Sequence, residues 1–440
     1  MAVDTERTVD VGRLLDERRI SALQVLVALL SACIMFVDGY DIQVMALAVP
    51  AIARDWSLAP SQFSYALSAV PLGLTLGAAV LAPLGDRAGR RTLLVMAMLA
   101  VGGTTVVAAT AASPAQFVLW RLLTGIAMGV SIPNCNAWTA EYVPTRSRAT
   151  ILVVMNAAIA VGATCAGFIA PAVFAHWGWR GAFLIGGAAP LAIGLLIWTL
   201  APESLKFLAL RRPHDPRIAS ILARIAPEID PSLPLRRPEA ARRISWLSVK
   251  ELLGSGYRRR TLVLWGVLLA NLFTLYILIN WLPTLLHLAG WSLDNALRGA
   301  VLIQAGGIVG GILLSMFLSR GLTPSALFVS YMITALCLVL FRAVGFGPSW
   351  AVIALIGAGT SGGQLALNVL STAYYPPAIK ATGMGWAGVV GNIGAFLGPV
   401  AGGWALDRGI SPVNILSILS VAPLLCALGA LLMRREWQWN

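Results

Sequence analysis

Long apolar stretches separated by short polar segments dominate this sequence. Each stretch is long enough to cross a bilayer as a helix, which takes about 20 predominantly apolar residues. The stretches cover residues 23–50, 62–84, 92–112, 115–140, 149–175, 180–201, 261–287, 296–318, 322–343, 347–373, 381–405 and 411–433. The pattern predicts an all-α membrane protein with twelve transmembrane helices.

The longest polar interval divides the predicted helices into two sets of six. Residues 202–257 are rich in Pro and Arg, and the periodicity within them predicts a short amphipathic helix at 215–226. Two six-helix bundles around a central cavity have this layout. We therefore expect an N-terminal bundle over 1–201, a cytoplasmic connector over 202–257 and a C-terminal bundle over 258–440.

The composition agrees with a chain surrounded mainly by lipid. Of its residues, 58% are hydrophobic and 12% charged, whereas a soluble domain carries about 25% charged residues. Small residues concentrate in 62–84 and 381–405, which predicts close helix packing there. The five cysteines all lie in predicted spans, without metal-ligand spacing, so we interpret them as packing residues. No metal site or cofactor is predicted.

The distribution of the positive charge predicts the orientation of the chain. With the N-terminus inside, 26 of the 32 Lys and Arg residues fall in inside segments and five in outside ones. Cytoplasmic loops carry such an excess, so both termini are expected in the cytoplasm, without a cleaved signal peptide. The net charge of +13 does not indicate nucleic acid, because no basic cluster lies beside aromatic residues. Three scattered histidines give no catalytic cluster, so an enzyme is not expected.

Two carboxylates lie within the first apolar stretch. Asp38 and Asp41 are three positions apart, so both fall on one face of a helix, with Gly39 between them. An ionised carboxylate at membrane depth costs several kcal/mol unless it is paired, hydrated or protonated. We interpret the pair as a site that takes up a proton or a cation during transport.

Arg121 is the basic residue that lies in the interior of a predicted span and not at its end. Counting along the helices places Asp41 about 13 Å and Arg121 about 9 Å from the outer ends of their helices, so the two can pair. The alternative is that Arg121 extends to the outer interface. If Arg121 neutralises Asp41, then Asp38 lacks a cationic partner, and desolvation favours its neutral form. Coupling would then rest on Asp41 with Arg121, and on Asp38 as their partner in handling the proton or the substrate.

The loop after the second span reads GDRAGRR. It resembles the cytoplasmic gate motif of the major facilitator superfamily, in which acidic and basic residues lock neighbouring helices. An ordinary basic loop is the alternative, but it would require neither the acidic residue nor the second glycine. The corresponding loop of the second half keeps only Arg320. The expected gate residues are Gly85, Asp86, Arg87, Gly89, Arg90 and Arg91.

Further motifs narrow this resemblance to one family. The DGYD of the first span is similar to the signature of the aromatic acid:H+ symporter family, and the matches continue over almost the whole chain. They include IPN, AEYVPTRSRAT, GWRGAF, PESLKFL, NWLPTLL, GGQLALN, YYPPAIKATGMGW and FLGPVAGG. The resemblance implies import of benzoate-like or protocatechuate-like acids with protons across a bacterial inner membrane. It also implies functional roles for Asp38, Asp41, Arg121 and Glu141. For Glu141, a gate ion pair and a proton relay both stay open.

Two positions depart from the family pattern. Lys380 stands where Arg often precedes ATG, and Asn392 stands where the eleventh span is expected to carry Arg. An Arg could bind a substrate carboxylate through two hydrogen bonds, whereas Asn offers only neutral ones. Recognition then falls to Arg121 or to neutral donors, or the substrate is an unusual acid, an ester, an amide or another oxygenated molecule.

Polar and aromatic residues on the cavity-lining helices are the candidate substrate contacts. Intramembrane Asn and Gln also serve as hydrogen-bonding links between helices, and Trp as a packing residue, so each has a structural alternative. The candidates are Tyr40, Asn134, Tyr276, Asn280, Gln304, Gln364, Asn368, Trp386 and Asn392.

The sequence as a whole favours a secondary active transporter in a bacterial inner membrane. It would import a small organic, in particular aromatic, acid by proton symport through alternating access. Proton-coupled efflux and uptake of a neutral oxygenated molecule are the alternatives within transport, and a membrane sensor is the alternative outside it. The expected partners are the substrate, protons and membrane lipid, with a monomer as the working unit.

Overall fold

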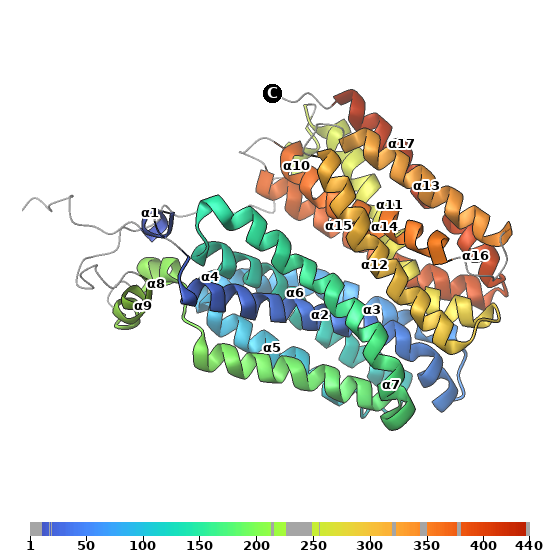
Figure 1. Cartoon of the computed structure of the whole chain (residues 1–440), viewed down its shortest axis with the longest axis horizontal. Helices are drawn as coiled ribbons and strands as arrows, with labels where there is room; N and C mark the ends of the chain where they lie inside the picture. Colours follow the sequence, from blue (N-terminus) through green and yellow to red (C-terminus); the bar gives the residue numbers. More distant parts are fainter. Residues whose placement is uncertain are drawn as a thin grey trace, which may run out of the picture.

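The helices of this chain are long and lie roughly parallel in two groups (Figure 1). The computed structural model describes residues 11–16, 18, 20–212, 215–225, 249–254, 256–318, 323–343, 350–375 and 380–436. In the first half these helices are α1 (Val11–Asp16), α2 (Ala22–Asp55), η1 (Pro60–Phe63), α3 (Ser64–Leu76), η2 (Gly77–Leu81), η3 (Ala82–Leu84), α4 (Gly85–Ala88), α5 (Arg90–Ala108), α6 (Pro114–Tyr142) and α7 (Thr145–Leu200). The remaining ones are α8 (Leu205–Arg211), α9 (Arg217–Ile225), α10 (Val249–Leu252), α11 (Arg258–Leu288), α12 (Leu293–Leu318), α13 (Thr323–Ala343), α14 (Trp350–Tyr374), α15 (Lys380–Asp407), α16 (Pro412–Leu419) and α17 (Val421–Glu436).

The number of membrane crossings agrees with the sequence. Among the described residues, eleven helical segments are long and apolar enough to cross a membrane. One of them, the 56-residue α7, is broken at Gly178, whose φ of 64° and ψ of −175° are not helical. Without a side chain, Gly178 adopts this conformation readily, and the chain can reverse there. The two arms of α7 are two spans, so the prediction of twelve transmembrane helices is confirmed.

The two groups of helices are joined at one end and separate at the other. We call the end that carries α1, α8, α9 and α10 the basic end, and the opposite one the far end (Figure 1). At the far end, one buried apolar cluster takes residues from both halves, among them Phe63 and Trp281. Towards the basic end each half has a cluster of its own, one around Leu94 and the other around Leu264. The structure is therefore closed at the far end.

Contacts between the halves support this reading. The Ser68 hydroxyl of α3 donates to the Phe396 carbonyl of α15 at 2.9 Å. A Cβ on Gly403 would meet the Ser64 side chain at 2.5 Å. Both contacts lie in the far half of α3 and α15, since α3 begins and α15 ends at that end.

Glycines allow the backbones of neighbouring helices to touch. A Cβ on Gly39 of α2 would lie 2.0 Å from the Ile159 carbonyl oxygen of α7, and one on Gly162 of α7 would lie 1.9 Å from the Phe36 carbonyl oxygen of α2. Equivalent contacts join α3 to α6 and α11 to α15, as at Gly73 and Gly394. The close packing predicted at 62–84 and 381–405 is thus confirmed. Such contacts matter because lipid provides little hydrophobic drive for helix association.

Short helices cover the basic end of the N-terminal group. The four aliphatic side chains on the apolar face of α9 are buried there, which confirms the amphipathic helix predicted at 215–226. The α1 segment is tied to the start of α7, because the Asp16 carboxylate accepts hydrogen bonds from the Thr145 amide and hydroxyl. These bonds, the amide one first, lower the pKa of Asp16. The boundaries 1–201, 202–257 and 258–440 stay predictions, and Arg320 lies outside the described residues.

The glycine contacts predict a position-specific effect on stability. Gly162→Ala should lower the free energy of unfolding by about 1–3 kcal/mol, because α2 and α7 must separate to make room for the methyl group. The matched control is Gly103→Ala on α5, where nothing lies within 4 Å of the added Cβ. Thermal unfolding in detergent measures both. Equal Tm values for the two variants would contradict the account.

Candidate functional site

The predicted pair of Asp41 and Arg121 is present and fully buried. Arg121 Nη1 donates to Asp41 Oδ1 at 2.9 Å, and Nη2 donates to Oδ2 at 2.6 Å. The exposed fractions of the two side chains are 0% for Arg121 and 1% for Asp41. Two parallel charge-assisted hydrogen bonds are the strongest arrangement open to these groups. The pair joins α2 to α6, and Arg121 does not extend to the interface.

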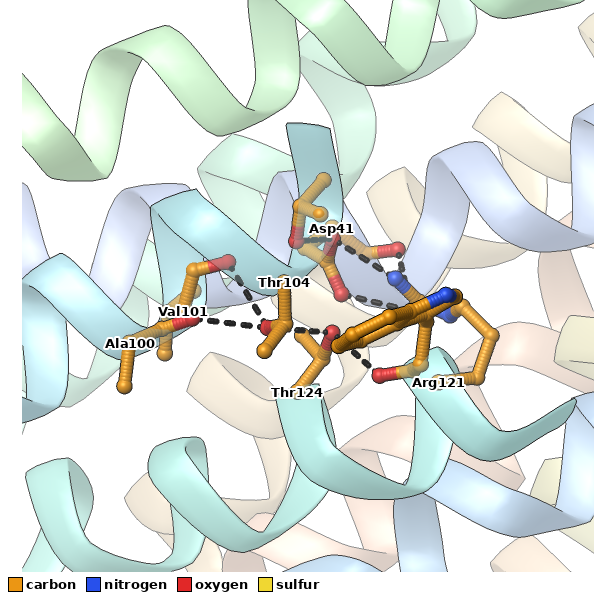
Figure 2. Close-up of polar contacts among 8 residues, drawn as sticks. Asp41, Ala100, Val101, Thr104, Arg121 and Thr124 are labelled. Atoms are coloured by element: carbon orange, nitrogen blue, oxygen red, sulfur yellow. Dashed lines mark hydrogen bonds and ion pairs between the residues drawn. The ribbon is translucent and has the colours of Figure 1, made fainter. Parts of the chain in front are cut away.

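Hydroxyl groups of α5 complete the surroundings of this ion pair (Figure 2). The Thr105 hydroxyl donates to Asp41 Oδ1 at 3.2 Å. The adjacent Thr104 hydroxyl lies 2.9 Å from that of Thr124, which is one turn along α6 from Arg121. On the other side, the guanidinium carbon of Arg121 lies 5.7 Å from the centre of the Phe183 ring. Three helices and an aromatic ring thus fix the pair.

Asp38 has very different surroundings, although it lies one turn from Asp41. Its side chain is fully buried. The Ser131 hydroxyl of α6 donates to Oδ2 at 3.1 Å, whereas Oδ1 has no hydrogen-bond partner among the described residues. No cation pairs with Asp38 in the part of the chain that the structure describes. An ionised carboxylate in this position costs several kcal/mol, and a protonated one costs much less.

Arg90, in the segment predicted as a gate, contacts three other side chains. It forms ion pairs with Asp86, four residues before it, and with Glu141 at the end of α6, 3.7 Å away. Its Nη1 also donates to Asn134 Oδ1 at 2.8 Å. Asn134 in turn donates to the Ala82 carbonyl at 3.1 Å, so this predicted substrate contact is engaged at the gate loop. In this arrangement Glu141 is one of the side chains that contact Arg90.

Glu203, which the sequence did not single out, holds the other side of this loop. Its carboxylate accepts a hydrogen bond from the Arg91 amide at 3.1 Å, in the first turn of α5, where a negative charge is favourable. Gly89 has a φ of 102°, and a Cβ there would lie 2.3 Å from Glu203 Oε2. Gly85 is constrained similarly, since its Cβ would meet Asn134 Oδ1 at 1.9 Å. Arg87 is exposed and has no ion-pair partner among the described residues.

Other candidate substrate contacts in the two bundles are buried to different degrees and differ in their partners. Tyr40 is 6% exposed and packs between α2 and α7, with no partner for its hydroxyl in the described chain. Asn280 donates to the Tyr276 carbonyl within α11 at 2.8 Å. Gln304 is 9% exposed on α12. Binding roles for these four residues stay predictions.

The remaining candidates lie on α14 and α15. Gln364 accepts a hydrogen bond from Asn271 of α11 at 2.8 Å and donates to Asn368 at 2.9 Å. The Trp386 ring lies 6.4 Å from that of Trp265 on α11. Asn392, which replaces the Arg expected on this span, is half-buried. The first half thus holds the charged groups, and the second half presents neutral amides.

Comparison with known proteins identifies the family. The family model described as the Major Facilitator Superfamily matches residues 31–399. This chain belongs to the major facilitator superfamily. Two relatives match almost end to end. The gallate transporter of Pseudomonas putida is 33% identical, covering 96% of this chain and 94% of the relative. The 4-hydroxybenzoate transporter PcaK of Acinetobacter baylyi is 32% identical, covering 95% and 93%. They match the aromatic acid:H+ symporter family within the superfamily.

Solved structures agree with this major facilitator fold. A bacterial homolog of the human lysosomal transporter Spinster, inward-facing and unoccupied, has a TM-score of 0.72 at 18% identity, covering 95% of this chain and 99% of that one. The inward open xylose transporter XylE from E. coli has a TM-score of 0.71 at 16% identity, covering 93% and 95%. The chain is therefore a multi-pass membrane protein of a transporter family.

The sequence did not identify four residues that complete the surroundings of candidate site residues: Thr105, Ser131, Glu203 and Asn271. Their side chains complete the surroundings of Asp41, Asp38, the gate loop and Gln364. Hydroxyl and amide residues are common in membrane helices, and their partners here lie far away in the chain, so no local pattern distinguishes them. The PESLKFL motif contained Glu203 but gave no indication of its partner.

Glu203 should control the start of α5. Glu203→Ala removes the acceptor of the Arg91 amide, so the first turn of α5 should exchange its amide hydrogens at least tenfold faster, as expected for a loss of about 1.4 kcal/mol. Glu203→Gln keeps an acceptor oxygen and should restore most of the protection. Hydrogen exchange read by mass spectrometry measures both. Unchanged exchange in Glu203→Ala would show that the carboxylate does not hold this turn.

Proposed function

We propose that this protein imports a small aromatic carboxylic acid together with a proton across the bacterial inner membrane. Alternating access moves the two six-helix bundles around a central site. Charge placement supports the orientation, with both termini and the basic end in the cytoplasm. In that orientation the structure is closed to the outside, because the cluster shared by both halves lies at the far end. The whole site lies within one chain, which favours a monomer as the working unit.

The observation that supports this proposal most directly is that two buried carboxylates have different partners. Asp41 is neutralised by Arg121, and Asp38, one turn away, has a single hydroxyl partner. Asp38 therefore holds the transported proton in its carboxyl group. When that proton moves to Asp41, the attraction between Asp41 and Arg121 is lost, and the proton that enters with the substrate takes its place on Asp38. The guanidinium is then free for the carboxylate of the substrate, which takes the place of the Asp41 carboxylate.

This exchange couples the two transported species. A substrate anion that enters without a proton would place two carboxylates next to one guanidinium in a medium of low dielectric constant, which is unfavourable. A proton that enters with it leaves the net charge of the site unchanged. Neither the anion nor the proton is favoured alone, so they are carried together.

Relatives support the substrate class. Their names specify gallate and 4-hydroxybenzoate, and that of a 29% identical relative from Escherichia coli specifies 3-(3-hydroxy-phenyl)propionate. All three are aromatic acids that carry hydroxyl groups on the ring. We infer the same class for this chain, with Arg121 as the carboxylate partner, because Asn392 offers only neutral hydrogen bonds.

The contacts of Arg90 suggest how the cytoplasmic side is closed. In the present arrangement Arg90 is held within the N-terminal bundle by Asp86, Glu141 and Asn134. Asp86 itself is largely exposed. When the basic ends approach each other, Asp86 is available to bind the C-terminal bundle and close the cytoplasmic side. The network thus belongs to the gate, with Glu141 as one of its members.

Uptake into proteoliposomes tests the proposed function. Labelled 4-hydroxybenzoate, gallate and 3-(3-hydroxyphenyl)propionate are offered with and without an inward proton gradient. At least one acid should accumulate with the gradient and be lost when an uncoupler is added. Absence of uptake for every acid by folded protein would reject this substrate class. Accumulation that is unchanged when the uncoupler is added would rule out proton coupling.

Two variants separate the roles of the carboxylates. Asp38→Asn and Asp41→Asn should each reduce gradient-driven accumulation at least about tenfold, because neither amide can carry the proton. Asp41→Asn imitates the protonated form of Asp41 and leaves Arg121 free for the substrate, so exchange of labelled for unlabelled acid without net proton movement should persist in that variant. Asp38→Asn removes the proton donor of Asp41, so it should lose this exchange as well. The control is Asp55→Asn, which removes an exposed ion pair with Arg180 that contributes little. Accumulation that survives Asp41→Asn would remove this mechanism.

A further inference from the structure

Three amide side chains form a hydrogen-bonded row from the interior of the C-terminal bundle towards its surface. Asn271 on α11 is 1% exposed. Its Nδ2 donates to Gln364 Oε1 at 2.8 Å, and Gln364 Nε2 donates to Asn368 Oδ1 at 2.9 Å. Asn368, at the other end of the row, is exposed. Its Nδ2 has no hydrogen-bond partner among the described residues.

The direction of these hydrogen bonds is determined at the buried end. Asn271 Nδ2 also faces the Thr360 carbonyl oxygen at 3.4 Å, and a carbonyl oxygen can only accept. Asn271 must therefore turn its NH2 group towards α14. Gln364 then has to present its oxygen to Asn271 and its NH2 group to Asn368. Asn368 has to present its oxygen to Gln364, so its own NH2 group points away from the row.

Helix geometry places the exposed end of the row away from an apolar groove of this bundle. That groove, of about 400 Å³, lies between α12, α13 and α14, and Leu355, Ala358 and Gly359 are its α14 residues. Asn368 follows Gly359 by nine positions, which is half a turn away at 3.6 residues per turn. It therefore lies on the opposite face of α14, the face that packs on α11 through Asn271.

We propose that Asn368 binds the ring substituent of the aromatic acid and selects an oxygen acceptor there, and that buried Asn271 imposes this choice without touching the substrate. Asn368 is then a specificity residue and Asn271 a positioning residue. The inference rests on the proposed function, in which Arg121 binds the carboxylate, and it adds that the ring extends towards the C-terminal bundle. A donor substituent would meet the NH2 group of Asn368. To present an oxygen in place of this NH2 group, the whole row would have to reverse and turn the Asn271 oxygen towards the Thr360 carbonyl.

Pairs of ligands with equal charge test the proposal. The 3- and 4-formylbenzoates carry an acceptor on the ring, and the 3- and 4-aminobenzoates carry a donor. Binding to the purified full-length protein is measured for each, and the result is the ratio of the two Kd values at each ring position. For at least one position the wild type should bind the formyl compound about tenfold more tightly, the value of one well-placed hydrogen bond.

Asn271→Leu should bring the ratio of the two Kd values closer to one, because the aminobenzoate binds more tightly. Without the Asn271 amide, the side-chain amides of Gln364 and Asn368 can turn over together, so that Asn368 presents its oxygen to the aminobenzoate. Binding of the formyl compound should weaken by about twofold, because half of the molecules still present the NH2 group. A packing defect weakens both ligands and does not produce this gain. The matched control is Thr274→Val, a buried α11 side chain whose hydroxyl donates within its own helix to Ala270, which should leave the ratio unchanged.

Asn368→Asp keeps the proposal testable if Asn271→Leu fails to fold. The substitution keeps the shape of the side chain but removes both N–H donors, so the preference should reverse in favour of the aminobenzoate. The added negative charge weakens both benzoates alike and leaves their ratio unaffected. A ratio that stays at the wild-type value in Asn368→Asp overturns the inference. Failure of the wild-type protein to bind any benzoate would instead overturn the proposed function, and the inference with it.

Discussion

The buried ion pair between Asp41 and Arg121 is the interaction on which the rest of the site depends. Two charges without access to water are tolerated because both oxygens of Asp41 accept from the guanidinium and Thr105 adds a third hydrogen bond. Removing one partner of such a pair is strongly destabilising, because the other is left charged and unpaired. The pair can therefore open only when something replaces one of its members. A proton on Asp41 and a carboxylate on the substrate are the replacements that preserve the charge.

Close contact between the backbones of α2 and α7 helps to exclude water from this pair. Gly39 lies two residues before Asp41, and a side chain there would collide with the Ile159 carbonyl of α7. The glycine that weakens the helix between the two aspartates is thus the residue that lets α2 and α7 close over them. At the far end the two halves share one apolar cluster. Since the basic ends have separate clusters, opening and closing can occur as movements of two preformed bodies.

The sequence predicted the crossings, the amphipathic helix at 215–226 and the pair of Asp41 and Arg121, because each follows from spacing or depth along a helix. It could not predict which partners the uncharged polar side chains find across helices. Asn134 was expected to face the substrate, but Arg90 binds its oxygen at the gate loop. Ser131 and Asn271 were not singled out at all, although they complete the surroundings of Asp38 and Gln364. Those partners depend on the rotation of each helix about its axis, which tertiary packing determines.

Proton movement caused by the substrate tests the central claim most directly. Proteoliposomes in weakly buffered medium, with no imposed gradient, receive an aromatic acid at the pH of the medium, and the external pH is recorded. We expect the medium to become more alkaline as the acid enters, and we expect Asp41→Asn to abolish this change while exchange of labelled acid continues. Entry of the acid at the wild-type rate without any movement of protons would contradict it.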